Sequence, residues 1–469
     1  MKNSIVFLFK IICLIIVVLL AGKLRFYKYD SVPLPGQSLD EYSNSWVGMS
    51  LIKIGLPVGI SGISGYQFND MRYINVDRVF QSTAYGNPVS INYPWFDHPP
   101  LMGLVTGGWA YLKGARVFEE ANSFIIRKPV VILGVISVGL LFIYGWLCYS
   151  FSVGLISSLI YATVPLMVVS SRMIQAENGL IPLFLLSLIL YKLFTKNNSL
   201  VYLFLCGIVS GLAILFKLSG IVVFLTIIFL MYFEKSKIKK EIIENIIFYG
   251  VIVFSIGIIF VIYGATYDLK QFMAIFLSNS NRFYGIGPAA VFDLFLQSRL
   301  THNKFITEAW PLVGWLSVLI SLFRKEKFKN KMWFALPIIT YLMIYLFFGS
   351  QPFGWYAYPF FPFLMLSIGW LIVNSDTIEK QIGALICLLL PFGYGITRIV
   401  SINDFQKYAS LWRWGLVSII ILFLILLKYK NKKFRKITKL LIYLILMLTI
   451  YLNIRYVLML DVDFWYKVS

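Results

Sequence analysis

The chain has few charged residues: only 13% of its 469 residues are Asp, Glu, Lys or Arg, where a soluble domain has roughly 25%. It also contains only two histidines and four cysteines. Cys13, Cys148, Cys206 and Cys387 lie within or beside apolar segments, so they indicate neither a disulfide framework nor a metal-binding motif. These shortages exclude a soluble globular protein and a disulfide-rich secreted domain.

Long apolar runs dominate instead, since 59% of the residues are hydrophobic. They are long enough to cross the ~30 Å hydrocarbon core of a membrane, where only structures that satisfy their own backbone hydrogen bonds are stable. The expected fold class is therefore all-α, a polytopic transmembrane helical bundle in a single domain over residues 1–469, with its first span retained rather than cleaved. About thirteen spans are expected, at 4–22, 125–147, 151–171, 176–194, 200–216, 219–233, 243–263, 306–323, 333–349, 355–373, 380–397, 412–428 and 438–458.

The formal net charge of +21 does not predict binding to nucleic acid, because the basic residues fall in short loops between spans, as the positive-inside rule requires. The basic clusters are at 235–240, 324–331 and 428–439. If these face the cytoplasm, the long loops 23–124 and 264–305 lie outside it. Lys23, Arg25 and Lys28 oppose this orientation, but the later loops outweigh them. We expect an integral, multi-pass protein of the plasma (inner) membrane with its active site on the extracytoplasmic side.

A short helix is expected within the first long loop. Ser38 and Glu41 have the spacing of a helix capping box. Apolar residues follow at helical spacing, and Gly55 and Pro57 end the helix. We expect this helix to lie in the membrane interface.

The unexpected charged residues lie at the predicted outer ends of the spans, whereas transporters and proton pumps usually place ionisable groups near the bilayer midplane. This pattern indicates an enzyme that works at the membrane surface rather than a carrier. The residues are Asp40, Glu41, Asp97, His98, Arg172, Glu177 and Lys217.

Asp40 and Glu41 are the candidate catalytic residues. A carboxylate at a helix N-terminus stays ionised, so Asp40 is suited to act as a general base that takes a proton from an acceptor hydroxyl. The alternative is structural: Glu41 completes the capping box, and Asp40 favours the helix dipole.

Asp97 and His98 precede Pro99 and Pro100, which fix an extended turn and hold the preceding side chains. We expect them to bind substrate, with His98 beside a phosphate; a plain interfacial turn is the alternative. Asp97, His98 and Glu177 also offer oxygen and nitrogen ligands to a divalent metal. We predict no cofactor and leave the metal open.

Three further segments contain candidate substrate-binding residues. Arg172 and Glu177, in the link between two spans, would orient the sugar or the phosphate, or else belong to a solvated turn. Lys217 ends a span on the side where lysines are rare, which favours a phosphate partner over a snorkelling side chain. A cation there would stabilise charge growing on a leaving phosphate. Tyr356 would contact phosphate or sugar, unless it belongs to an interfacial aromatic belt.

In their order along the chain, these motifs resemble those of the GT-C membrane glycosyltransferases, in the branch of the dolichyl-phosphate-mannose protein mannosyltransferases and the aminoarabinose transferases. That pattern has Asp-Glu after the first span, then [Lys/His]-Pro-Pro-Leu, an acid near span four, Gly-Leu-Ala-x-Leu-x-Lys and an aromatic-proline segment. The chain has Asp40-Glu41, His98–Leu101, Glu177, Gly211–Lys217 and Tyr356–Pro359. His98 stands where aminoarabinose transferases have lysine, and Glu177 where aspartate is common.

The resemblance implies an inverting glycosyltransferase that moves a sugar from a polyprenyl-phosphate carrier to an extracytoplasmic lipid, glycan, cell-wall polymer or protein hydroxyl. It makes Asp40 the catalytic base and assigns Lys217, with help from Tyr356, to the donor phosphate. Expected partners are the lipid-linked donor and membrane lipids; the acceptor, the sugar (hexose or pentose) and the carrier length are left open. Two alternatives remain: a lipid-linked oligosaccharide polymerase or ligase that uses a diphosphate carrier, and a flippase or transporter of lipid-linked sugars.

Overall fold

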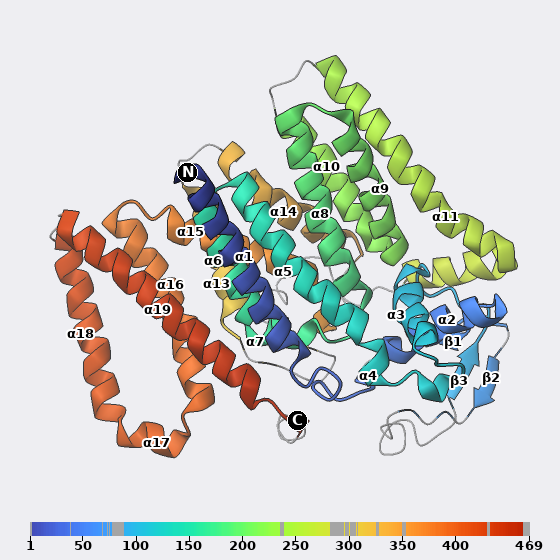
Figure 1. Cartoon of the computed structure of the whole chain (residues 1–469), viewed down its shortest axis with the longest axis horizontal. Helices are drawn as coiled ribbons and strands as arrows, with labels where there is room; N and C mark the ends of the chain where they lie inside the picture. The colour runs from blue at the N-terminus through green and yellow to red at the C-terminus, as the bar shows by residue number, and fades with distance from the viewer. Residues whose placement is uncertain are drawn as a thin grey trace.

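The fold is a bundle of helices with one small sheet at one end (Figure 1). Among the described residues, seven helices are long and apolar enough to cross a membrane, and shorter apolar helices accompany them. The all-α transmembrane bundle predicted from the sequence is confirmed, and the protein is an integral, multi-pass membrane protein. The computed structural model describes residues 2–37, 39–67, 69–72, 74, 76, 89–234, 239–281, 295, 300, 306, 308–324, 328–348, 353–428 and 432–462.

Each predicted span corresponds to a helix or to a pair of consecutive short helices. The long elements are α1 Lys2–Phe26, α5 Lys128–Cys148, α6 Phe151–Thr163 with α7 Pro165–Ser170, α8 Ala176–Asn197, α9 Leu200–Phe216, α10 Ile221–Phe233, α11 Lys239–Ser280, α13 Trp310–Phe323, α14 Met332–Phe348, α15 Phe361–Val373, α16 Ile378–Ile399, α18 Ala409–Lys428 and α19 Lys432–Met459. The short ones are η2 Phe118–Glu120, α4 Ser123–Ile126, η3 Leu218–Gly220, η4 Phe328–Asn330, η5 Gly354–Phe360 and α17 Ile402–Lys407.

Two spans differ from the prediction. Span 151–171 is divided into α6 and α7 at Val164, which is extended (φ −60°, ψ 121°) because the residue before a proline disfavours the helical conformation. Span 243–263 continues as α11 to Ser280, with a break at Asp268 (φ −164°, ψ 99°). The first part of the predicted loop 264–305 is therefore helical, and most of the remainder lies outside the described residues.

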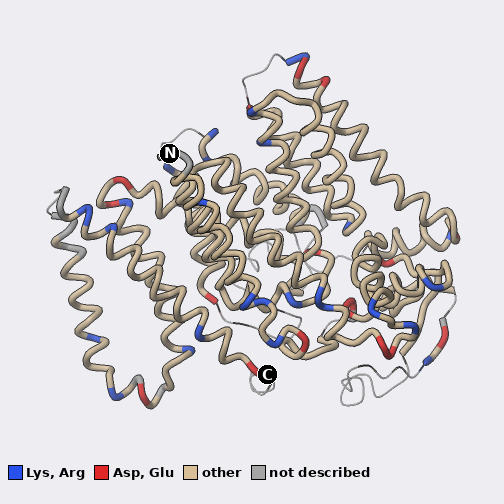
Figure 2. The backbone as a smooth tube through the Cα atoms, viewed as in Figure 1, with Lys and Arg blue, Asp and Glu red and all other residues tan. Residues whose placement is uncertain are grey.

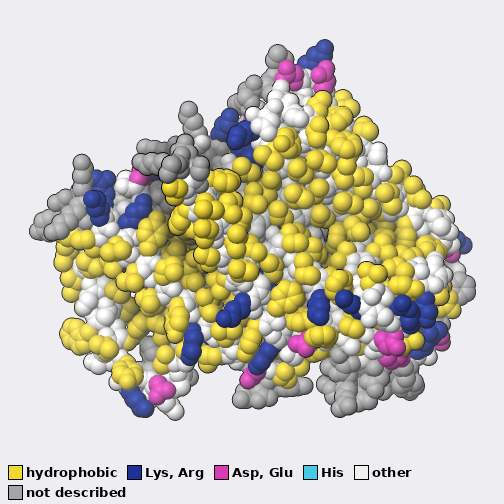
Figure 3. All heavy atoms as spheres, in the orientation of Figure 1, with side chains coloured by type: hydrophobic (Ala, Val, Ile, Leu, Met, Phe, Trp, Pro, Cys, Tyr) yellow, Lys and Arg dark blue, Asp and Glu magenta, His cyan; other side chains and the backbone are white. Residues whose placement is uncertain are grey.

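The connections alternate between two ends of the bundle. The N-terminus of α1, the adjoining ends of α10 and α11 and the adjoining ends of α18 and α19 lie toward the upper end in Figure 1. The described part of the first long loop and its sheet lie at the lower end, which we call the loop end. Figure 3 shows a broad hydrophobic band between these ends, and charged residues gather toward them in Figure 2. This arrangement agrees with the alternation that the basic clusters predict.

The first long loop folds around α2 Leu39–Ile54 and α3 Leu101–Leu112, which pack against each other. Beside them lies an antiparallel sheet in the order β1-β3-β2, formed by β1 Gly59–Ile60, β2 Asn69–Arg72 and β3 Val89–Asn92. The register pairs Gly59 with Asn92 and Asp70 with Ile91. The sequence analysis did not predict this sheet, because strands of two to four residues are too short to show an alternating pattern.

Helix α2 ends where predicted, because Gly55 adopts φ +69°, the left-handed conformation that glycine favours after a helix. Its predicted cap, Ser38, lies outside the described residues. Every side chain from Glu41 to Ser50 is buried, and a helix buried on all sides belongs to a core. The helix expected in the membrane interface is thus enclosed by the folded loop.

Helices α2 and α3 touch through glycines. A Cβ atom added at Gly48 would lie 1.8 Å from the Gly103 carbonyl oxygen, and one at Gly107 would lie 2.2 Å from that of Ser45. No side chain fits at these distances, so the two backbones are in direct contact.

We expect Gly48→Ala to lower stability by about 1–3 kcal/mol, because the added methyl group overpacks the α2–α3 contact. The measurement is the thermal unfolding midpoint of the purified protein in detergent. Gly22→Ala is the matched control, since a Cβ there meets nothing within 4 Å and alanine is the better helix former; its midpoint should hold or rise. Equal midpoints for Gly48→Ala and the wild type would contradict the direct backbone contact.

Candidate active site

Glu177 and Lys217 meet in a buried ion pair at the loop end of the bundle. Glu177 lies in the first turn of α8, and Lys217 directly follows α9, so the antiparallel packing of these helices brings the two together. Lys217 Nζ donates a hydrogen bond to Glu177 Oε1, and the side chains are 11% and 0% exposed. Burial by itself lowers the pKa of Lys217, but Glu177, Tyr356 and Asp40 together outweigh burial and raise it. The ammonium group therefore stays charged.

Two more candidates join this pair. Lys217 Nζ lies 4.3 Å from the centroid of the Tyr356 ring in η5, a distance typical of a cation–π contact. Asp40, in the first turn of α2, is near enough for its charge to raise the pKa of Lys217 further. Lys217, Glu177, Tyr356 and, through its charge, Asp40 thus come from four separate segments to one region, and their role as a site stays a prediction.

One carboxylate oxygen of this group lacks a hydrogen-bond donor. Glu177 Oε2 is buried and has no hydrogen-bond partner among the residues that the structure describes. A buried acceptor without a donor is unfavourable, so a donor that reached this oxygen would stabilise the site. The neighbouring η5 is held by Tyr358, whose hydroxyl donates to the Leu300 carbonyl at 2.8 Å.

Glu41 forms a second buried ion pair, with Arg127. Arg127 donates through Nε to Oε1 and through Nη2 to Oε2, the latter at 3.0 Å, and the side chains are 0% and 3% exposed. Glu41 Oε2 also accepts from the Gly36 amide at 3.0 Å. Such a two-point contact fixes geometry, so Glu41 is a structural contact in this fold, and the catalytic role expected from the sequence stays a prediction.

Arg127 was missed by the sequence analysis, although an arginine in an apolar span was a usable signal. Besides Glu41, it donates to the Tyr29 carbonyl at 3.0 Å and to the Pro33 and Leu34 carbonyls at 2.6 and 3.2 Å. One side chain thereby holds the whole segment that leads from α1 to α2.

Arg172 holds the same segment from another direction, whereas Arg25 ties the end of α1 to α6; both side chains are fully buried. Arg172 donates to the Val32 and Leu24 carbonyls at 2.9 and 2.8 Å. Burial and the positive charges of Arg127 and Arg25 lower its pKa. These contacts make Arg172 an anchor of the first loop, so we do not include it among the substrate-binding residues.

Arg25 is one of the three basic residues that opposed the predicted orientation. Its guanidinium donates to the Ala162 and Tyr161 carbonyls at 3.1 and 3.0 Å, in the last turn of α6. Carbonyl groups at a helix C-terminus carry partial negative charge and attract cations. Arg25 is therefore a packing residue, and its charge carries no information about topology.

The segment before His98 is held by α11. Asn279 Nδ2 donates to the Asp97 carbonyl at 2.8 Å, Gln271 Nε2 to that of Pro94 at 3.3 Å, and Tyr263 Oη to that of Trp95 at 3.2 Å. The segment is thus held at three carbonyl groups.

The Asp97 carboxylate serves the loop itself, because it accepts from Ser61 Oγ at 2.8 Å and Tyr66 Oη at 2.6 Å. His98 stands edge-on to Trp95, with ring centroids 5.9 Å apart. Phe96 packs in one apolar cluster with Leu215, two residues before Lys217, which brings this segment to the end of α9.

The residues described here contain no group of three or more His, Cys, Asp or Glu side chains placed to hold a metal ion. Asp97, His98 and Glu177, the ligands considered from the sequence, do not form such a group.

Comparison with known proteins supports the resemblance found in the sequence. The sequence model of the family described as dolichyl-phosphate-mannose-protein mannosyltransferase matches residues 97–263, a stretch that includes His98, Glu177 and Lys217 but neither Asp40 nor Tyr356. No curated protein sequence matches the chain significantly.

Solved structures show the same fold at low sequence identity. ArnT from Cupriavidus metallidurans bound to undecaprenyl phosphate has a TM-score of 0.56 at 13% identity, over 95% of this chain and 76% of that one. The oligosaccharyltransferase AglB from Archaeoglobus fulgidus, in complex with an inhibitory peptide and a dolichol-phosphate, has a TM-score of 0.51 at 14% identity. The match covers 96% of this chain and 56% of AglB. The arabinosyltransferase EmbB from Mycobacterium smegmatis has a TM-score of 0.50 at 12% identity, and the match covers 94% of this chain and 40% of EmbB. The GT-C fold predicted from the sequence is confirmed.

We expect Arg127→Gln to lower stability by about 3–5 kcal/mol, because it leaves the buried Glu41 carboxylate without its partner. The measurements are the unfolding midpoint and the rate of proteolysis within the first loop. The matched control is Arg72→Gln, which breaks a pair with Asp70 whose side chains are 54% and 46% exposed and should cost at most about 1 kcal/mol. Similar losses in the two variants would contradict the role of Arg127.

Proposed function

We propose that the protein is an inverting glycosyltransferase that moves a sugar from a polyprenyl-phosphate carrier to an acceptor hydroxyl. The observation that carries the proposal is the convergence of Asp40, Glu177, Lys217 and Tyr356 at the loop end. The family match and the shared fold support it, as do the undecaprenyl phosphate in the ArnT structure and the dolichol-phosphate in the AglB structure.

The proposed reaction exchanges one bond at the anomeric carbon for another. The Asp40 carboxylate takes the proton of the acceptor hydroxyl while that oxygen forms its bond to the anomeric carbon. The bond between this carbon and the phosphate oxygen breaks, and polyprenyl phosphate leaves with the electron pair. Attack opposite to the leaving group inverts the configuration, and Lys217 stabilises the charge that grows on the phosphate.

The ion pair of Lys217 and Glu177 prepares the site for this donor. Without substrate, the Glu177 carboxylate neutralises a lysine that would otherwise be a buried, unpaired cation. A donor phosphate supplies a further negative charge to Lys217. Glu177 Oε2 accepts a hydrogen bond from a sugar hydroxyl, and Tyr356 stacks on the sugar ring. His98 is placed in this proposal beside the phosphate, which it assists when its imidazole is protonated.

The orientation follows from charge. The starts of α11, α14 and α19, which adjoin the basic clusters, lie toward the end of the bundle opposite to the first long loop, and basic loops remain in the cytoplasm. The site then faces the extracytoplasmic side of the plasma membrane, where a lipid-linked donor enters from the bilayer and no nucleotide is required. The sugar, hexose or pentose, is identified by testing donors.

Asp40→Asn should reduce transfer roughly a hundred- to ten-thousandfold, because the amide cannot accept the acceptor proton, while donor binding persists. The measurement is transfer by the protein in liposomes supplied with a panel of polyprenyl-phosphate and polyprenyl-diphosphate sugars. Asp70→Asn is the control, since this carboxylate lies in the same loop but pairs with exposed Arg72; it should retain full turnover. Unchanged turnover by Asp40→Asn would refute the assignment of Asp40 as the catalytic base. Turnover of diphosphate donors alone would favour a polymerase or ligase. Lipid-linked sugar that crosses the bilayer without being transferred would indicate a flippase.

The role of Lys217 is tested by comparing Glu177→Gln, which keeps the lysine without its carboxylate partner, with a double variant that removes both charges. Glu177→Gln combined with Lys217→Met should bind the donor roughly ten- to a hundredfold more weakly than Glu177→Gln alone, because a charge-assisted contact contributes ~1.5–3 kcal/mol. The measurement is equilibrium binding of a non-hydrolysable donor analogue. Lys53→Met, which removes an exposed lysine that bonds to the Arg116 carbonyl, should bind like the wild type. Equal affinity in the first two variants would remove Lys217 from the site.

A further inference from the structure

The part of α11 that follows its break at Asp268 exposes an apolar face at the loop end. Figure 1 shows that α11 changes direction there and turns back across the end of the bundle. We call residues 269–280 the distal segment of α11. Its exposed large apolar side chains, between 36% and 54% exposed, are Leu269, Met273, Phe276 and Leu277. Intervals of three and four residues place them on one face of the helix, which the proposed reaction does not use.

The opposite face of the distal segment is attached to the first loop. Gln271, Phe272 and Ile275 are buried, and the last two pack in one apolar cluster with Phe96. Gln271 and Asn279 also donate to carbonyl groups of the segment before His98. These contacts turn the exposed face away from the first loop.

The length of the preceding span places the break of α11 at the boundary of the membrane. Residues 245–267 contain no Asp, Glu, Lys or Arg. At 1.5 Å per residue they extend over roughly 34 Å, slightly more than the ~30 Å hydrocarbon core of a bilayer. Ile258 and Ile262 are 54% and 57% exposed, so this span faces lipid. Tyr263 and Tyr267 lie near its outer end, and tyrosines gather where hydrocarbon meets the head groups. The distal segment therefore begins at the surface of the bilayer.

A bilayer is the occupant that fits this exposed face. Large apolar side chains that gather on one surface are unfavourable in water, and the hydrophobic band in Figure 3 extends along α11 to this end of the bundle. Residues 269–280 carry a single charge, that of Lys270. A lysine side chain is long enough to reach lipid phosphates while its stem lies among apolar groups.

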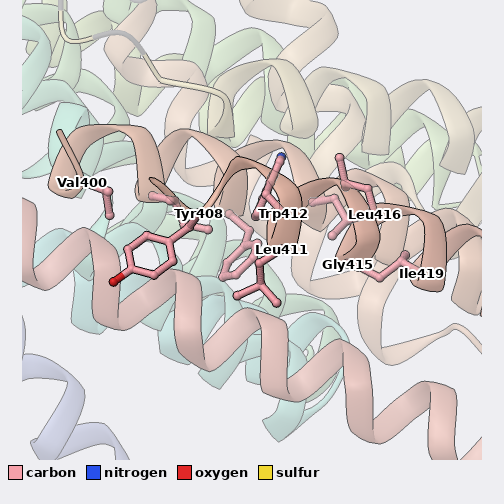
Figure 4. A pocket seen from close by; sticks show the side chains of 10 residues that line it. Val400, Tyr408, Leu411, Trp412, Gly415, Leu416 and Ile419 are labelled. Atoms are coloured by element: carbon pink, nitrogen blue, oxygen red, sulfur yellow. The ribbon is translucent and has the colours of Figure 1, made fainter. Parts of the chain in front are cut away.

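An open cleft between α16 and α18 is also apolar, and its lining includes Phe392, Trp412 and Gly415 (Figure 4). Nothing in the part of the chain that the structure describes indicates what covers this cleft. The distal segment of α11 differs, because the span before it sets its depth in the membrane and the first loop behind it sets its orientation.

We propose that the distal segment of α11 lies in the membrane leaflet at the loop end, with Leu269, Met273 and Leu277 among the acyl chains and Lys270 at the lipid phosphates. Through this helix, the bilayer supports the loop segment before His98. The inference does not rest on the proposed glycosyltransferase activity, because it concerns only how the loop end meets the membrane.

The test is site-directed spin labelling of the full-length protein in phosphatidylcholine and phosphatidylglycerol liposomes, with the native cysteines replaced by alanine. A nitroxide attached to Met273→Cys should collide often with oxygen, which concentrates in hydrocarbon, and rarely with a water-soluble nickel complex. Ile262→Cys, in the span of α11, is the lipid reference. Met71→Cys is the matched water reference, since this residue of β2 is 58% exposed beside the exposed pair of Asp70 and Arg72.

The oxygen-to-nickel collision ratio of Met273→Cys should equal that of Ile262→Cys and exceed that of Met71→Cys several-fold. A ratio like that of Met71→Cys would place the face in water. Infrequent collisions with both reagents would mean that another part of the protein covers it. Either result would overturn the proposal.

A second measurement keeps the native cysteines, in case the protein without them does not fold. Leu277→Glu should speed amide hydrogen exchange of residues 269–280 several-fold in lipid nanodiscs, because a carboxylate is excluded from hydrocarbon and lifts the helix from the membrane. Lys270→Glu is the matched control, since it adds the same carboxylate at a position that is already charged, and it should exchange like the wild type. On a face in water both substitutions would be harmless, so equal exchange in the two variants would refute contact with the bilayer.

Discussion

The cost of placing a charged side chain away from water governs the loop end of this bundle. The side chains of Arg25, Arg127 and Arg172 are fully buried there, and those of Glu41 and Glu177 are no more than 3% exposed. Each is stable only with a matched partner. Arg25 and Arg172 contact backbone carbonyl groups, Arg127 pairs with Glu41, and Glu177 pairs with Lys217. Because the partners come from distant segments, these contacts attach the first loop to the helices.

The same constraint shapes the candidate active site. Lys217 keeps its charge because Glu177 accompanies it, and Asp40 reaches this pair on a helix held by two other contacts. One of these is the pair of Glu41 with Arg127, and the other is the close approach of Gly48 to α3. A base must be held within a fraction of an ångström of its productive position, so residues that never touch the substrate contribute to the proposed chemistry.

Particular residues show how far sequence reasoning extends. The spans were predictable because hydrocarbon imposes one requirement on every residue that crosses it, and the end of α2 because Gly55 and Pro57 are local signals. The approach of Tyr356 to Lys217 was expected from the order of the motifs. The partner of Glu41 was not expected, because 86 residues separate Glu41 from Arg127 and no local sequence pattern links the two. Glu41 shows the consequence: a carboxylate expected from the sequence to serve catalysis is held in the structure by a buried guanidinium.

The sequence by itself determined the class of protein, the positions of its spans and the set of polar residues from which a site is built, because each of these depends on local composition or spacing. The tertiary structure decided which of those residues meet. It joined Lys217 to Glu177, turned Arg172 toward the backbone of the first loop, extended α11 over the segment before His98 and left a cleft at Gly415. The physical reason is that pairing and packing energies depend on distance in space, and chain order sets that distance only after the whole bundle has assembled.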